Sequence, residues 1–138
     1  MIRPIVTARL MLRQPSEPAT STDAQIGQDL LDTLAANVER CHGMAANMIG
    51  ERKRILVYWD EAAGGGKLMY NPEILERGGE YRVEEGCLSL PGFREATRYQ
   101  RIRVRYQDEG FAWRERSFQG LVAETIQHEM DHFEGILI

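Results

Sequence analysis

Apolar residues recur at intervals of four between positions 26 and 38, the period of one face of an α-helix. They are Ile26, Leu30, Leu34 and Val38. The preceding stretch, 15–22, is rich in Pro, Ser and Thr and is typical of a loop. Thr22 and Gln25 have the spacing of a capping box at a helix start. We therefore predict a helix that follows the loop, buries its apolar stripe in the core and ends near Gly43.

Short runs of apolar and β-branched residues farther along the chain predict strands. They cover 55–58, 67–70, 81–83, 102–106 and 112–118, with a hairpin turn at 108–110 before the last one. A final helix is predicted from about Leu121 to Phe133. Helix, strands and helix in this order indicate an α+β domain, with antiparallel β-sheets packed around the C-terminal helix. We expect one domain over residues 1–138.

Composition and charge narrow the range of functions expected for this chain. The chain has 138 residues, 43% of them hydrophobic and 28% charged, with a net charge of −4. We expect no direct nucleic-acid binding, because no broad basic surface is indicated, and no membrane span, because no apolar run approaches about 20 residues. Two cysteines do not form a disulfide framework. The stretch 1–12 lacks a signal-peptide pattern, so a bacterial cytoplasm is expected.

The segment 128–132 reads His-Glu-Met-Asp-His and fits the pattern HExxH. On a helix its two histidines lie one turn apart on the same face and can hold one metal ion. The carboxylate between them can act on a water at the same site. The chain has only three histidines, and two are used here. A metal site is therefore favoured over the alternative of a solvated helix end.

A catalytic metal site of this type has three protein ligands. The chain matches the extended pattern HExxHxxGxxH as far as Gly135. The last ligand position of this pattern is occupied by Ile138, which cannot bind a metal. The third ligand must come from upstream. Cys87, in Glu-Gly-Cys-Leu-Ser at 85–89, is the best candidate, since a thiolate binds zinc or ferrous iron strongly. Cys41 is its rival.

At this point the chain resembles the peptide deformylases. Residues 85–89 and Gln-His-Glu-Met-Asp-His at 127–132 look like two motifs of that family, and the runs 43–46 and 70–75 resemble two more of its segments. The resemblance implies a deformylase fold and removal of the formyl group from the N-terminal methionine of new bacterial chains. The implied substrates are N-formylated peptides or nascent chains. The resemblance leaves undecided whether the protein contacts the ribosome.

The resemblance also implies one divalent metal ion, held by Cys87, His128 and His132. Fe²⁺ is expected as the native metal, with Zn²⁺ or Ni²⁺ as substitutes. Such an ion lowers the pKa of water from 15.7 towards about 7. Glu129 is expected to accept the proton and deliver it to the leaving amine, and the backbone N–H of Leu88 to stabilise the oxyanion.

The first motif departs from the family at Met48, where a glutamine is usual. That glutamine donates a hydrogen bond to the oxyanion, and a thioether has no donor. Losing one such donor typically costs about 10²–10³ in rate. Asn47 is not expected to replace it, because neighbouring side chains of an extended segment point to opposite faces. We therefore hypothesise slow deformylation.

The substrate pocket also departs from the family. Glu124 lies one helical turn before His128 where an apolar residue is usual, and His42 replaces another apolar residue. We expect both to bind substrate, together with Gly43, Met48 and Arg94. Four alternatives stay open for Glu124. It pairs with Arg94 or His42, or it makes the pocket accept a polar or cationic side chain. Otherwise it orients a metal histidine or faces solvent. Glu85 is expected to be held by Arg98 or Arg101.

Two alternative functions stay open. One is a metallopeptidase or amidase of other specificity, which the missing ligand at Ile138 disfavours. The other is a non-catalytic homologue that keeps its metal and binds nascent chains. Met48 favours this second alternative, whereas the retained Glu129 disfavours it, because a structural metal needs no base.

Overall fold

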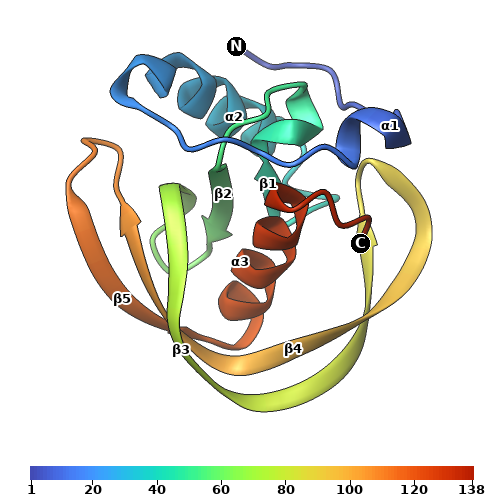
Figure 1. Ribbon diagram of the computed structural model, residues 1–138, viewed down its shortest axis with the longest axis vertical. Helices are drawn as coiled ribbons and strands as arrows, with labels where there is room; N and C mark the ends of the chain where they lie inside the picture. Colours follow the sequence, from blue (N-terminus) through green and yellow to red (C-terminus); the bar gives the residue numbers. More distant parts are fainter.

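The computed structural model describes residues 1–138 (Figure 1). Its elements are α1 (Arg9–Leu12), η1 (Ser21–Asp23), α2 (Ala24–Ala36), β1 (Gly43–Ala45), η2 (Ala46–Ile49), β2 (Ile55–Asp60), β3 (Gly65–Cys87), β4 (Leu90–Gln107), β5 (Trp113–Gln119) and α3 (Gly120–Phe133). None of the helices combines the length and the apolar character needed to cross a membrane.

The five strands form one antiparallel sheet in the order β1-β2-β3-β4-β5. β3 and β4 form a long curved hairpin that wraps around α3, so the helix lies inside the bowl of the sheet (Figure 1). Shifts of register between Tyr70 and Glu73, and between Ile74 and Glu76, allow this bending, because a bulge increases the local bend and twist of a strand. The predicted α+β class is confirmed.

Two buried clusters hold the layers together. One packs α2 on β1–β3 through residues such as Leu30, Leu34, Met44 and Val57. The other packs α3 against β2, β4 and β5, and includes Tyr58, Ile102, Val104, Ile126 and Phe133. Because both faces of β2 are covered, this strand is an almost continuous apolar run. The packing fixes α3, and hence its histidines, relative to the sheet.

The start and end of α2 differ from the prediction. The capping box is formed by Thr20 and Asp23 at the start of η1, the turn that leads into α2, instead of by Thr22 and Gln25, and the Thr20 amide donates to the Asp23 carboxylate at 2.9 Å. The helix ends at Ala36 and not near Gly43. The Asn37 side chain donates back to the Thr33 carbonyl at 2.7 Å, which offers the backbone an alternative to further helical bonds.

The predicted strands at 67–70 and 81–83 are parts of one strand, β3, of 23 residues. The intervening segment carries Pro72, Gly78 and Gly79, which disfavour strand interiors in sequence reasoning. Gly79, at a φ of +77°, and the two register shifts accommodate them within the curved hairpin. The predicted strand at 112–118 and the final helix are confirmed within one residue at each end.

Candidate metal centre and active site

On α3, His132 and His128 contact Cys87 and Glu85 at the end of β3, and Glu129 lies beside Gly43 of β1. Gln127 fastens the helix to β4, because its amide accepts from the Tyr99 N–H at 2.9 Å and donates to the Tyr99 carbonyl at 2.8 Å. Asn47 holds the C-terminal end of α3, because its side-chain amide donates to the His132 carbonyl at 3.2 Å. The direction of the two histidines is therefore set by contacts with both neighbouring layers.

Three potential metal ligands converge where β3 ends. The Sγ of Cys87 lies 3.6 Å from Nε2 of His132, which lies 3.2 Å from Nε2 of His128. Around one tetrahedral ion with ordinary bond lengths, sulfur and nitrogen ligands are about 3.5 Å apart and two nitrogens about 3.3 Å apart. The donor set therefore fits a single divalent ion. Cys41 does not belong to this cluster, so the structure brings together the ligand set predicted with Cys87.

A buried carboxylate orients the first histidine. Oε1 of Glu85 lies 2.8 Å from Nδ1 of His128, so an Nδ1–H that donates to it leaves Nε2 free for the cluster. Arg98 donates to both oxygens of Glu85 and, at 2.7 Å, to Asp131. Burial opposes the charge of Glu85, but the hydrogen bonds from His128 and Arg98 prevail and lower its pKa to about 2. Of the two expected partners of Glu85, Arg98 is the one observed.

Glu129 lies in a fully buried environment beside the cluster. Its Oε1 has no hydrogen-bond partner. Burial raises its pKa to about 7, although the neighbouring His128 acts in the opposite direction. A carboxyl group with a pKa near the working pH can both accept and deliver a proton. The Nδ1 atom of His132 is also buried without a partner.

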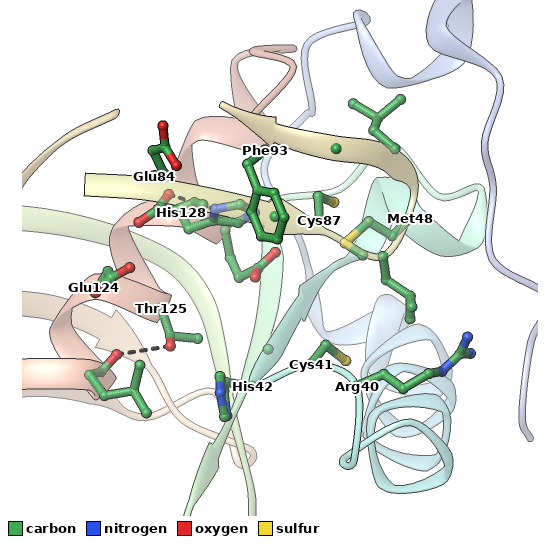
Figure 2. Close-up of a pocket in the computed structure, with 18 residues that line it drawn as sticks. Arg40, Cys41, His42, Met48, Glu84, Cys87, Phe93, Glu124, Thr125 and His128 are labelled. Atoms are coloured by element: carbon green, nitrogen blue, oxygen red, sulfur yellow. Dashed lines mark hydrogen bonds and ion pairs between the residues drawn. The ribbon is translucent and has the colours of Figure 1, made fainter. Parts of the chain in front are cut away.

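A pocket of about 540 Å³ opens from the cluster (Figure 2). Four of the predicted substrate residues line it, namely His42, Gly43, Met48 and Glu124, together with Leu88. Arg94 does not line it, and its guanidinium donates to the Pro91 carbonyl at 2.9 Å.

Gly43 forms a close contact between β1 and α3. An added Cβ would lie 2.6 Å from the Thr125 methyl group and 3.3 Å from Oε2 of Glu129. A side chain at position 43 would therefore displace α3 or enter the site. This requirement explains why a glycine stands at this position of the pocket wall.

Met48 is almost fully buried and lies on η2, which replaces the expected extended segment. Asn47 directs its amide away from the pocket, to the carbonyls of His132 and Leu12. The expectation that Asn47 does not replace the missing donor therefore agrees with the geometry, although the reason is a 3₁₀ turn and not strand alternation.

Of the alternatives for Glu124, pairing with Arg94 or His42 is wrong. It accepts a hydrogen bond from the Tyr81 hydroxyl at 3.3 Å. The sequence analysis also missed the clamp of Gln127 on Tyr99. The sequence contains one signal that places Tyr81 near the site. Alternate residues of a strand share a face, and Tyr81 precedes Glu85 by four residues on the same strand.

The chain is similar to known proteins in both sequence and fold. The family described as polypeptide deformylase matches residues 2–138. A peptide deformylase of Clostridium beijerinckii is 51% identical over 140 aligned positions, covering 100% of both chains. The crystal structure of a peptide deformylase from Legionella pneumophila is 33% identical, with a TM-score of 0.86 over 99% of this chain and 83% of that one. A Met-Ala-Ser-bound class I type b peptide deformylase from Acinetobacter baumannii is 26% identical, with a TM-score of 0.86 over 99% and 97%.

Proposed function

Because this chain belongs to the peptide deformylase family, a family of hydrolases that act on N-formylated nascent peptides, we propose that Cys87, His128 and His132 hold its metal ion as ligands. The observation that carries the proposal is the approach of three ligand atoms within 4.8 Å of one another at the head of the pocket. Ferrous iron is the ion we propose, with zinc or nickel as substitutes. When bound, such an ion supplies Lewis-acid activation of water and of a carbonyl oxygen.

Glu129 is the proposed general base and acid. Its carboxylate lies beside the ligand cluster, is shielded from solvent, and has one oxygen without a partner. It takes the proton of the attacking water and passes it to the amine that leaves when the bond between the formyl carbon and the amide nitrogen breaks. The products are formate and a free N-terminus.

The site offers few hydrogen-bond donors to the oxyanion that forms during hydrolysis. The proposed donor is the backbone N–H of Leu88, which follows Cys87 and lines the pocket. Met48 occupies the pocket wall without offering a donor. We propose that deformylation of formyl-methionyl peptides is therefore slowed by about 10²–10³ relative to a site with a side-chain amide at position 48.

We place the protein in the cytoplasm, where nascent chains carry their formyl group, and propose that it meets its substrates at the ribosome. The large identity over the full length of the Clostridium relative supports a shared substrate class. The net charge of −4 gives no support to a broad electrostatic contact with RNA, so any ribosome contact is expected to be local.

The test is formate release from formyl-Met-Ala-Ser by anaerobically purified, iron-loaded protein. The peptide corresponds to the Met-Ala-Ser seen bound to the Acinetobacter enzyme. Wild-type protein should release formate, and Glu129→Ala should lower kcat by about 10²–10⁴. Glu109→Ala, in an exposed turn, is the matched control. Absence of formate release by metal-loaded wild type, or full activity of Glu129→Ala, would overturn the proposal.

A further inference from the structure

The pocket continues beyond the metal cluster along the first turns of α3. Glu124 and Thr125 stand one helical turn before His128 and Glu129 and therefore face the same space. Gly43 lies opposite, close to Thr125. A substrate whose formyl carbon sits at the cluster carries its first side chain only two bonds farther along, so this side chain enters the space beside Glu124.

Carboxylates dominate this pocket. Four of its 18 lining residues are glutamates, and Arg40 is its one permanent cation. Figure 2 shows Arg40 and Glu124 at opposite ends of the view. Glu85 is neutralised by Arg98, and Glu129 serves the reaction. The other two glutamates, Glu84 and Glu124, have neither an ion-pair partner nor a role in the proposed reaction. Glu84 is exposed, whereas Glu124 is half-buried.

Glu124 lacks a cationic partner within the protein. It accepts a hydrogen bond from a neutral donor, the Tyr81 hydroxyl, and its other polar neighbour is the Glu85 carboxyl group. Burial and the neighbouring Glu85 carboxylate raise the pKa of Glu124, so its charge is poorly stabilised where it stands. An apolar substrate side chain would remove water from this carboxylate and offer no hydrogen bond in return, whereas an ammonium or guanidinium group would satisfy it.

We propose that the subsite beside Glu124 binds a cationic first side chain, lysine or arginine, more tightly than an apolar side chain of equal length. This inference rests on the deformylase function proposed above and deepens it. N-formylated peptides with a basic first residue then join formyl-methionyl peptides as substrates. The Glu124 carboxylate forms a charge-assisted hydrogen bond with the substrate side chain and acts as a specificity residue, without touching the reacting atoms.

The test compares formyl-Lys-Ala-Ser with formyl-norleucyl-Ala-Ser, whose first side chains have the same carbon chain with and without the ammonium group. For iron-loaded wild type we expect kcat/KM to favour lysine, and Glu124→Gln to lower the lysine-to-norleucine ratio about tenfold or more. Glu84→Gln, which removes an exposed carboxylate of the same pocket, should change the ratio less than about threefold. A wild-type preference for norleucine that Glu124→Gln leaves unchanged would overturn the proposal.

Binding measurements separate this proposal from the catalytic one. If no formyl peptide is hydrolysed, the proposed function fails, but the dissociation constants of the same two peptides for the metal-loaded protein still report on the subsite. Tighter binding of the lysyl peptide that Glu124→Gln abolishes would support the subsite independently of turnover. Equal dissociation constants in wild type and variant would overturn it.

Discussion

Nδ1 of His128 lies 2.8 Å from Oε1 of Glu85, a residue 43 positions earlier in the chain. Both side chains are buried, and Arg98 holds the same carboxylate from the neighbouring strand. A carboxylate that accepts from Nδ1–H fixes the tautomer in which Nε2 is available for the metal. The metal centre therefore depends on the β3–β4 hairpin as much as on the helix that carries the motif.

Glu85→Gln is expected to weaken zinc binding by about 10–100-fold, because the amide orients His128 without the negative charge that increases its basicity. Competition with a chromophoric chelator measures the change, and circular dichroism checks that the variant is folded. Glu84→Gln, one residue away and exposed, is the control and should bind zinc like the wild type. Equal zinc affinity of Glu85→Gln and wild type would show that Glu85 does not support the centre.

Arg98→Met should lower the free energy of unfolding by about 3–5 kcal/mol, because it leaves the buried Glu85 carboxylate without its cation. Urea denaturation at constant excess zinc measures the loss. Arg82→Met breaks an exposed ion pair on the same hairpin and should leave the stability almost unchanged. A similar small effect for both variants would contradict the role assigned to Arg98.

The two cysteines should differ in reactivity once the metal is removed. Burial raises the pKa of Cys41 to about 11, so only about one thiol in 10³ is ionised at pH 8, and its alkylation should rise about tenfold per pH unit up to that pKa. Iodoacetamide at pH 8 followed by peptide mass spectrometry should label Cys87 after chelation and spare Cys41. Zinc should protect Cys87. Protection of Cys41 by zinc would instead assign it as a ligand.

Local sequence patterns predicted the parts of the site that lie on one element. Two histidines four residues apart, inside a helical apolar pattern, sufficed for α3 and for the face that His128 and His132 share. The choice of Cys87 came from its own motif and from the family resemblance. These predictions need no knowledge of how the chain folds back on itself.

Contacts between distant segments could not be predicted in the same way. The partner of Glu124 depends on the register of β3 against α3, and Tyr81 meets it 43 residues away. The bond from Asn47 to the His132 carbonyl spans 85 residues. The full length of β3 could not be predicted because Pro72, Gly78 and Gly79 are unfavourable in strand interiors, whereas pairing with β4 keeps the segment in the sheet.

The decisive measurement is kcat for formyl-Met-Ala-Ser with iron-loaded wild type, Met48→Gln and Met48→Leu. Met48 is buried on the pocket wall, and glutamine has nearly the same length. We expect Met48→Gln to raise kcat by about 10²–10³, because it restores an oxyanion donor, whereas Met48→Leu should give no gain. Wild-type turnover that Met48→Gln does not increase would contradict the claim that a missing donor limits this enzyme.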